Sequence, residues 1–353
     1  MKQVKLVKLG AVVLCSTLLL PTAVNAESIF DSWFKPHHAT NKIKFQLNKI
    51  KKEMQSLKQT KLLKVKVDCE DTQQALKNAL EKQAYAAENV RFIISGECQG
   101  PLLVGRSGIE IVNNRDSSGS IVVSDSNATE GILVRNGSLK IKDLTINVPA
   151  DIQAVSATAN SVLELNNVQT NAHSSEGAAA FSHYQARANS SLYATSMEKV
   201  TFAINGSSYA EFLAGNSGLM LNIADTSTAL SDAANSFNAV QVAGNGYFMA
   251  DKQTQVELLM IWSKGAATAV DNSVIGEVQM GGQTMFAAYA GSTVNGPYGI
   301  WGNVIFEIDH STANNWTSVD KPHSIISGNN ATINGTTYEG WGWSGQDGTV
   351  TAE

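Results

Sequence analysis

Two carboxylates near the C-terminal end of the chain have a spacing that acid–base chemistry can use. Glu307 and Asp309 stand two residues apart in the segment VIFEIDHST. On a strand, such residues share one side about 6.5–7 Å apart, near the low end of the roughly 6.5–9.5 Å separation in inverting glycoside hydrolases. His310 would lie on the opposite side. Because strand alternation alone produces this pattern, we favour an ordinary polar strand face and keep the pair as the catalytic alternative.

Large aromatic residues gather towards the C-terminus, where residues 301–353 hold four of the six tryptophans. Aromatic rings offer rigid apolar faces on which a sugar ring can stack. The candidate ligand-binding residues are therefore Tyr298, Trp301, Trp341 and Trp343. The alternative is that these rings cover the last coil of the fold, as a C-terminal cap over residues 320–353.

No metal or cofactor site stands out. His37 and His38 adjoin, but no third ligand follows at a spacing typical of metal sites. We predict no metal and no cofactor.

Cys69 and Cys98 are the two cysteines outside residues 1–26, and we predict that they form one structural disulfide. The run DTQQALKNAL between them predicts a short helix, with Asp71 as N-cap and Gln74 completing a capping box. The apolar side of this helix consists of Ala75, Leu76, Ala79 and Leu80.

The first 26 residues have the pattern of a secretory signal peptide. Lysines at positions 2, 5 and 8 precede an apolar run over residues 9–20, and Val24-Asn25-Ala26 resembles a cleavage site. We expect an exported bacterial protein, periplasmic, secreted or on the cell surface, without a transmembrane span.

Residues 27–64 form a basic segment with nine lysines against three acidic residues, a net charge of +6. Its apolar residues follow a heptad spacing: Ile43, Leu47, Ile50, Met54 and Leu57. The alternatives are one amphipathic helix on the protein body, a short coiled coil that forms a homo-oligomer through residues 41–63, and a basic helix on a surface. Residues 143–353 carry five basic and eighteen acidic groups, a net of −13, which argues against nucleic acid.

A polar turn followed by an aliphatic strand recurs along the chain. It starts at Asn136, Asn160, Asn189, Asn216, Asn245 and Asn272, at spacings of 24, 29, 27, 29 and 27 residues. We therefore expect a solenoid with a period near 27 residues and eight or nine coils, each with two or three short strands. In this register a polar ladder would contain Asn166, Thr195, Asn222 and Asp251.

The segments DTQQALKNAL, VRFIISGEC, PLLV and GIEIV, with the irregular coils after them, resemble the right-handed parallel β-helix superfamily of pectate-lyase-like proteins. The resemblance implies an all-β fold in which a helix caps the first coil, with a β-helix domain over residues 65–353 and its N-terminal cap over residues 65–100. The Asn-Thr-Asp, Asp-Asp, Gly-His-Gly and Arg-Ile-Lys motifs of polygalacturonases are missing, and so is the carboxylate cluster with an arginine base of pectate lyases.

The expected function is therefore that of a non-catalytic binding or scaffold module that contacts a glycan or another cell-surface component. The first alternative is a polysaccharide lyase or glycoside hydrolase. The second is an oligomeric adhesin or stalk.

Overall fold

The computed structural model describes residues 62–114, 117–171, 182–316 and 325–344. The chain divides into two units, Met1–Thr60 and Lys61–Glu353. The predicted signal peptide and the heptad seam at residues 43–57 lie outside the described residues, as do His37 and His38. In the ranges that the structure describes, no helix has both the length and the apolar character needed to cross a membrane.

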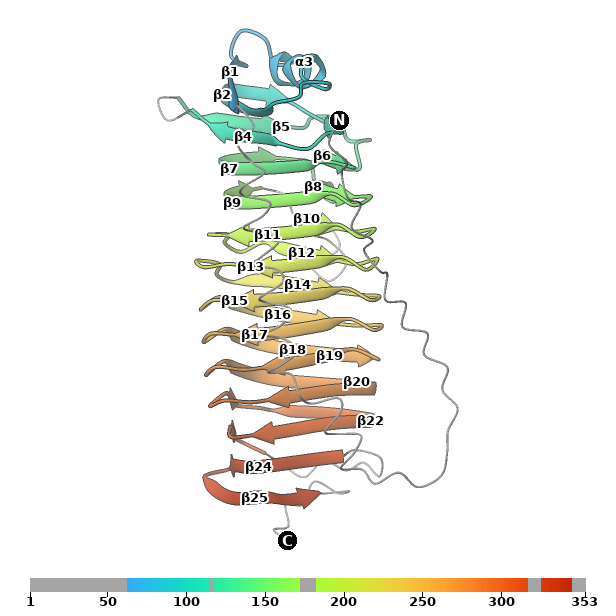
Figure 1. Ribbon diagram of the computed structural model, residues 1–353, viewed down its shortest axis with the longest axis vertical. Coiled ribbons are helices and arrows are strands. Elements are labelled where there is room, and N and C mark those ends of the chain that lie inside the picture. The colour runs from blue at the N-terminus through green and yellow to red at the C-terminus, as the bar shows by residue number, and fades with distance from the viewer. Residues whose placement is uncertain (1–61, 115–116, 172–181, 317–324, 345–353) are drawn as a thin grey trace, which may run out of the picture. The chain divides into compact units, whose positions relative to one another are not determined.

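The second unit is an all-β parallel solenoid of about 11 turns (Figure 1). Its described strands form one hydrogen-bonded ladder of 25 strands, in which every pairing is parallel except that of the last two, β24 and β25. The expected parallel solenoid is thus confirmed. Two sides of the coil carry most of the residues discussed below, and we call them face A and face B.

Face A contains β1 (Leu62–Asp68), β2 (Asn89–Gln99), β4 (Ile109–Asn113), β7 (Ser138–Asn147), β9 (Val162–Thr170), β11 (Ser191–Thr195), β13 (Tyr209–Phe212), β15 (Thr228–Asp232), β17 (Tyr247–Asp251), β19 (Ala266–Ala269), the C-terminal parts of β20 (Val274–Ala288) and β22 (Tyr298–Asp309), and β24 (Ile325–Ile333). Face B contains β3 (Leu102–Val104), β6 (Glu130–Arg135), β8 (Gln153–Thr158), β10 (Tyr184–Ala186), β12 (Thr201–Ile204), β14 (Leu219–Ile223), β16 (Ser236–Val242), β18 (Gln255–Ser263) and the middle of β20 with the start of β22. The remaining strands are β5 (Gly119–Val122), β21 (Thr293–Val294), β23 (Thr312–Ala313) and the terminal β25 (Thr336–Ser344).

The length of a turn differs from the expected period. From β13 to β20, face A pairs residues that lie 19 positions apart, namely Ala210, Ala229, Phe248, Ala267 and Phe286. The predicted period near 27 is therefore wrong for this part, and the predicted eight or nine coils are too few for a solenoid of about 11 turns. The reason is that the polar turn occurs at more than one corner: Asn189 precedes β11 on face A, Asn216 precedes β14 on face B, and Asn245 precedes β17 on face A.

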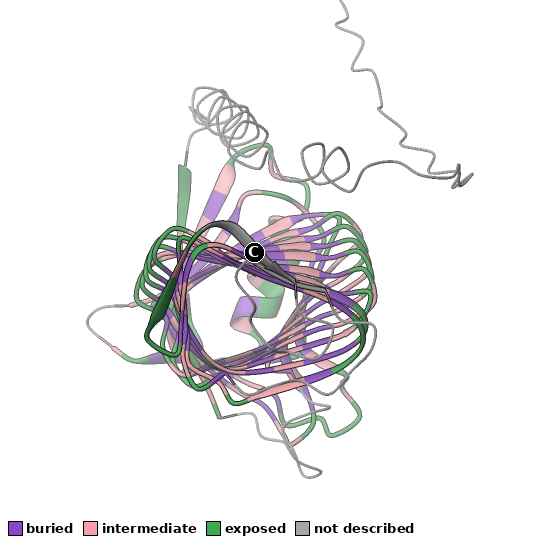
Figure 2. Cartoon of the chain, turned by 90° about the horizontal axis from the view of Figure 1, so that it is seen from below, coloured by how far each residue is buried: buried purple, intermediate pink, exposed green. Residues whose placement is uncertain are grey.

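Alternate residues of most strands are buried, as the alternating colours of Figure 2 show in the view along the coil, and their side chains form the hydrophobic interior. A run of fully buried phenylalanines forms its centre, where Phe202, Phe212, Phe237 and Phe248 contact one another edge to face at centroid distances of 5.0, 5.3 and 5.7 Å. This geometry is the favoured one for aromatic pairs. Successive turns are therefore held in register by packing as well as by backbone hydrogen bonds.

One corner of the coil carries a buried serine ladder. Its members are Ser161, Ser190, Ser208 and Ser227, each of which stands directly before a face A strand. The hydroxyl oxygen of each serine from Ser190 onward accepts a hydrogen bond of 3.1 Å from the backbone N–H of the ladder serine one turn earlier in the chain. The ladder satisfies backbone donors at a corner where the strands do not pair, which a buried turn requires.

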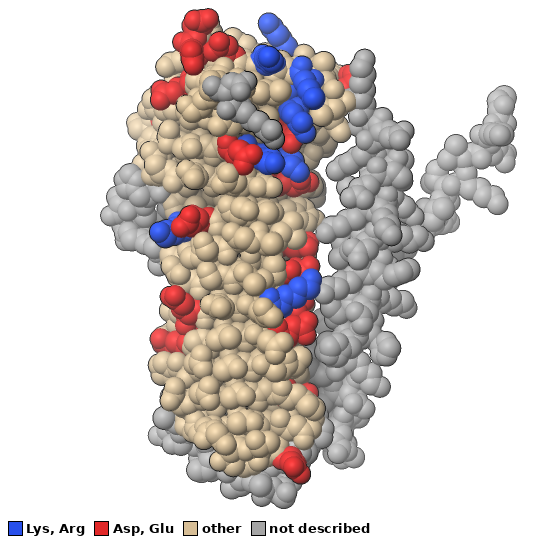
Figure 3. Space-filling view, turned by 90° about the vertical axis from the view of Figure 1, so that its left-hand side faces the viewer, with Lys and Arg blue, Asp and Glu red and all other residues tan. Residues whose placement is uncertain are grey.

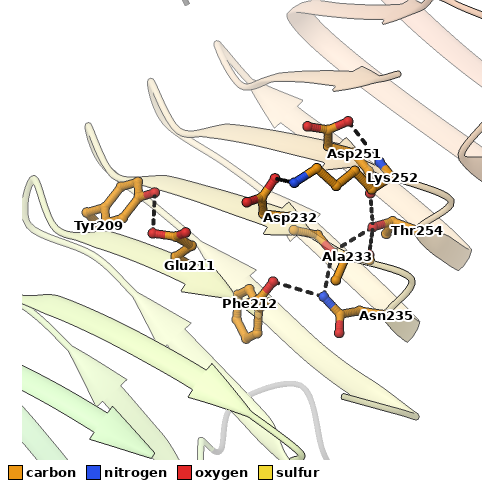
Figure 4. A network of polar contacts seen from close by, with 10 residues as sticks. Tyr209, Glu211, Phe212, Asp232, Ala233, Asn235, Asp251, Lys252 and Thr254 are labelled. Carbon is orange, nitrogen blue, oxygen red and sulfur yellow. Dashed lines mark hydrogen bonds and ion pairs between the residues drawn. The ribbon is translucent and has the colours of Figure 1, made fainter. Parts of the chain in front are cut away.

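A second corner uses longer polar side chains, and Figure 4 shows part of it. Asn235 donates from Nδ2 to the Phe212 carbonyl at 2.9 Å, and its Oδ1 accepts from the N–H of Asn216 at 3.1 Å. Close by, the Lys252 ammonium lies 2.6 Å from an Asp232 carboxylate oxygen. Lys252 thereby screens the repulsion between Asp232 and Asp251, which are direct partners on β15 and β17.

The predicted polar ladder is correct only in part. Asn166 pairs with Thr195 on face A, and Asp251 belongs to the same face. Asn222 instead lies on face B, between Ala203 and Gln241, because the assumed period was too long.

Figure 3 shows the charges of one side, with most lysines and arginines near the first turns and a broad uncharged area below them.

The N-terminal end of the solenoid holds one helix, α3 (Ala75–Lys82), whose Leu76 and Leu80 are buried in the same hydrophobic cluster as the strands. The predicted apolar side is thus confirmed, but the predicted Asp71 cap is wrong. Gln74 occupies the N-cap position without a side-chain cap bond, because residues 72–74 form a separate turn in which the Thr72 carbonyl accepts from the N–H of Ala75 at 2.8 Å.

The predicted disulfide joins Cys69 and Cys98, both of which are buried. It links the end of β1 to the last part of β2, across the loop that contains α3. β1 itself begins at Leu62, so the last three residues of the predicted basic segment, 62–64, are strand.

Candidate functional site

The most distinctive surface feature is a pair of tryptophans on face B. Trp262 of β18 and Trp301 of β22 both pair, in the strand register, with Gly281 of β20, which lies between them. Their rings are nearly parallel, with an interplanar angle of 23° and centroids 5.6 Å apart. Trp301 is 42% exposed, which is unusual for so large an apolar side chain.

Glycines make room for both rings. A Cβ atom at Gly281 would lie 2.5 and 2.6 Å from two atoms of the Trp262 ring, and a Cβ at Gly299 would lie 2.8 Å from the Trp301 ring. A Cβ atom does not make nonbonded contacts this short, so any larger residue would displace the rings. The two glycines therefore let the rings lie against the backbone of the sheet. We call Trp262, Trp301, Gly281 and Gly299 the tryptophan platform.

The neighbouring outward positions are mostly uncharged. Gln279 lies two residues before Gly281 on β20, and Met260 lies two residues before Trp262 on β18. Gln279 donates from Nε2 to the Glu277 carboxylate at 2.5 Å, which orients its amide oxygen and one carboxylate. The site thus combines flat apolar rings with amide groups at their edge, a combination suited to a ligand that has both apolar faces and hydroxyl groups.

The four aromatic residues predicted for ligand binding have different environments. Trp301 belongs to the platform. Tyr298 packs against the core, where its ring lies 4.7 Å from that of Trp316. Its hydroxyl oxygen lies 2.9 Å from each of the carbonyl oxygens of Val294 and Asn314, which share its one hydrogen. Trp341 and Trp343 lie on β25, and their side chains are outside the described residues.

Trp262 was missed in the sequence analysis because it lies far from the C-terminal aromatic cluster. The usable signal was the spacing of 262, 281 and 301, which equals one turn of 19 or 20 residues at each step.

The carboxylates Glu307 and Asp309 lie on face A, away from the platform along β22. Glu307 is only 3% exposed, and it accepts a hydrogen bond of 2.9 Å from the hydroxyl of Tyr289. Burial raises the pKa of Glu307, the Tyr289 hydrogen bond opposes this, and the charge of Asp309 adds to the rise.

The predicted position of His310 on the opposite side is wrong. His310 has a φ of 47°, so the chain turns and its Nδ1 lies 2.5 Å from Asp309 Oδ1, while Nε2 faces the Asn330 amide at 3.2 Å. Residues Tyr289, Glu307, Asp309 and His310 thus form one polar cluster. Inverting hydrolysis requires that a sugar and a water molecule reach the carboxyl groups. The Glu307 carboxyl is almost fully covered, so neither has direct access to it.

A groove with a largely apolar lining lies between α3 and the strands β3 and β6, with a volume of about 680 Å³. Leu103 lines it at 63% exposure, and Arg106 stands at its edge. The Arg106 guanidinium already donates to the carbonyls of Gln83 and Glu88, at 3.0 and 2.6 Å, so it braces the loop after α3. Among the described residues, no group of three or more His, Cys, Asp or Glu side chains is arranged to hold a metal ion.

Comparison of the chain with protein-family models, with curated proteins and with solved structures finds no match.

Proposed function

We propose that this chain is an exported, non-catalytic β-helix protein of the pectate-lyase-like type that binds a glycan through the tryptophan platform. The observation that carries the proposal is the near-parallel pair Trp262 and Trp301 lying over Gly281 and Gly299. A bulky residue at either glycine would fill the space of a ring, so the residues of three strands combine to hold the rings on the surface. Rigid rings held in advance lose little conformational freedom on binding.

The enzyme alternative is less well supported by the geometry. Glu307, one of its two candidate carboxylates, is covered and hydrogen-bonded to Tyr289, and it does not face the platform. The stalk alternative depends on residues 41–63 and stays a separate proposal, since only Leu62 and Leu63 of that range are described.

Several finer features of the proposal come from the sequence. Export rests on the signal-peptide pattern of residues 1–26, and the Cys69–Cys98 disulfide fits an oxidising compartment. The right-handed coil follows from the resemblance to pectate-lyase-like proteins. We also propose that α3 caps the first turn, because its Leu76 and Leu80 join the hydrophobic cluster of the strands.

A glycan screen followed by titration calorimetry tests the proposal. Trp262→Ala and Trp301→Ala should each weaken binding of the glycan found in the screen at least tenfold, in line with the loss of a central aromatic anchor. Tyr85→Ala is the matched control, since Tyr85 is a fully exposed aromatic residue at the N-terminal end, outside the platform. Unchanged affinity of both tryptophan variants would refute the platform as the binding site.

A further inference from the structure

We infer that the ligand is a neutral, linear polysaccharide that runs along the solenoid axis over face B, from the tryptophan platform across a column of amide side chains. The inference rests on the proposed function, and it adds the charge, the shape and the direction of the ligand.

The column consists of outward residues that are direct partners on successive strands. Its members from β10 to β20 are Gln185, Ala203, Asn222, Gln241, Met260 and Gln279. All six are half-exposed. With neighbouring strands about 4.8 Å apart, the column covers about 24 Å along the axis. One pyranose unit of an extended chain has a length similar to one strand spacing, so each turn can present one side chain to each sugar.

The column joins the platform without a gap. Gln279 precedes Gly281 by two residues on β20, and Met260 precedes Trp262 by two residues on β18. A chain that stacks on the tryptophans therefore continues directly onto Gln279, Gln241 and Asn222.

The amides in the middle of the column are available to a ligand. Ala203 and Met260 interrupt the series, so the amides do not form one continuous side-chain ladder. Among the described residues, no hydrogen bond is present to the side-chain amides of Asn222 and Gln241. Each such amide offers two donors and one acceptor, which matches sugar hydroxyl groups.

The column contains no charged side chain, and this points to an uncharged ligand. The next outward column on the same strands is formed by Met220, Ala239, Leu258 and Glu277, so its single charge is negative and lies at one end. A uronate chain would lose water from its carboxylates here without gaining a free cation, because Arg187, two residues after Gln185, is already paired with Glu130 at 2.9 Å. We therefore expect the column to bind a neutral polysaccharide in preference to an acidic one.

Titration calorimetry on the full mature chain tests the inference. The probes are linear β-1,4-linked oligosaccharides of glucose, mannose and N-acetylglucosamine with two to six units, and glucose oligosaccharides oxidised to carboxylates at C6. Affinity for the best neutral series should rise with length up to about the six units that the column can hold, and the carboxylated hexamer should bind at least tenfold more weakly.

Variants separate this inference from the proposed function. Asn222→Ala and Gln241→Ala should each weaken hexamer binding about 2- to 10-fold, the worth of one hydrogen bond, and leave dimer binding unchanged. Asn166→Ala, an outward amide on face A, is the matched control. Hexamer and dimer binding of equal strength, or unchanged hexamer binding by both amide variants, would overturn the axial path while leaving the platform intact. Binding of no neutral oligosaccharide, or full binding by the Trp262→Ala and Trp301→Ala double variant, would overturn the platform itself.

Discussion

The Cys69–Cys98 disulfide should stabilise one end of the solenoid and leave the rest unaffected. The two cysteines are 29 residues apart, and in the chain-entropy model a loop of that length contributes about 3.6 kcal/mol. Backbone bonds cross the same region, since Cys69 N–H donates to the Ser95 carbonyl at 2.9 Å and Gln99 N–H donates to the Gln73 carbonyl at 2.7 Å. Without the covalent link, these bonds, the parallel pairing of β1 with β2 and the packing of Leu76 and Leu80 would still hold β1 and α3 to β2.

The suitable assay is native-state hydrogen exchange of the oxidised and the reduced protein, because reduction keeps both sulfur atoms in place. Amides of residues 62–99 should exchange up to about 400-fold faster after reduction, which is about 3.6 kcal/mol expressed as a rate ratio. Amides of β15 to β18 should keep their protection, since each turn of a solenoid contacts only its neighbours. Unchanged exchange in residues 62–99, or an equal loss of protection along the whole solenoid, would refute this reasoning.

Three further variants test other parts of the structure. Ser208→Ala removes the acceptor of the buried Ser190 N–H and should lower the unfolding free energy by about 1–3 kcal/mol in denaturant titration. The control Thr226→Ala, at an exposed position, should change the unfolding free energy by less than about 0.5 kcal/mol. Equal effects of the two variants would contradict the role of the serine ladder. Phe237→Ala, between Phe212 and Phe248, should cost about 3–5 kcal/mol in the same titration, and a loss below about 1 kcal/mol would contradict the packing account. Burial raises the pKa of Glu307 above its ordinary value of 4.5, so its protonated form favours the folded state and stability should fall as pH rises from that value through the raised pKa. Glu307→Gln should flatten this pH dependence, and an unchanged pH profile of the unfolding free energy would count against it.

The sequence is sufficient to predict the type of fold, because alternation and turn residues act locally. Leu139 and Ile141 point inward as alternation requires, and Asn136, Asn160 and Asn189 adopt positive φ at the turns. The disulfide also follows from the count of cysteines outside residues 1–26. Alternation and turns depend on neighbouring residues, and the disulfide is predicted from the cysteine count, so none of these predictions needs knowledge of the register.

The register itself is not predictable from a polar motif that recurs at several corners. Asn189 and Asn245 are 56 residues apart, which is three turns of 18 or 19 residues, and the motif at Asn216 lies between them on another side. This ambiguity gave the wrong period. With the wrong period, Trp262 and Trp301 could not be recognised as neighbours, because their contact depends on strand pairing across two complete turns.

The burial of Glu307 could not be predicted either. Its strand position is outward by alternation, and only the three-dimensional arrangement shows that Tyr289 from the preceding turn covers it. A pattern of two carboxylates on one strand therefore does not establish that either one is accessible to a substrate.

Fluorine NMR of the protein labelled with 5-fluorotryptophan tests the central claim most directly, because each tryptophan gives its own signal. Addition of the neutral hexamer that binds best should shift the signals of Trp262 and Trp301, assigned by single Trp→Phe variants, and leave that of the buried Trp316 unchanged. Shifts confined to Trp341 and Trp343, or saturation of binding without any shift at Trp262 and Trp301, would contradict the account.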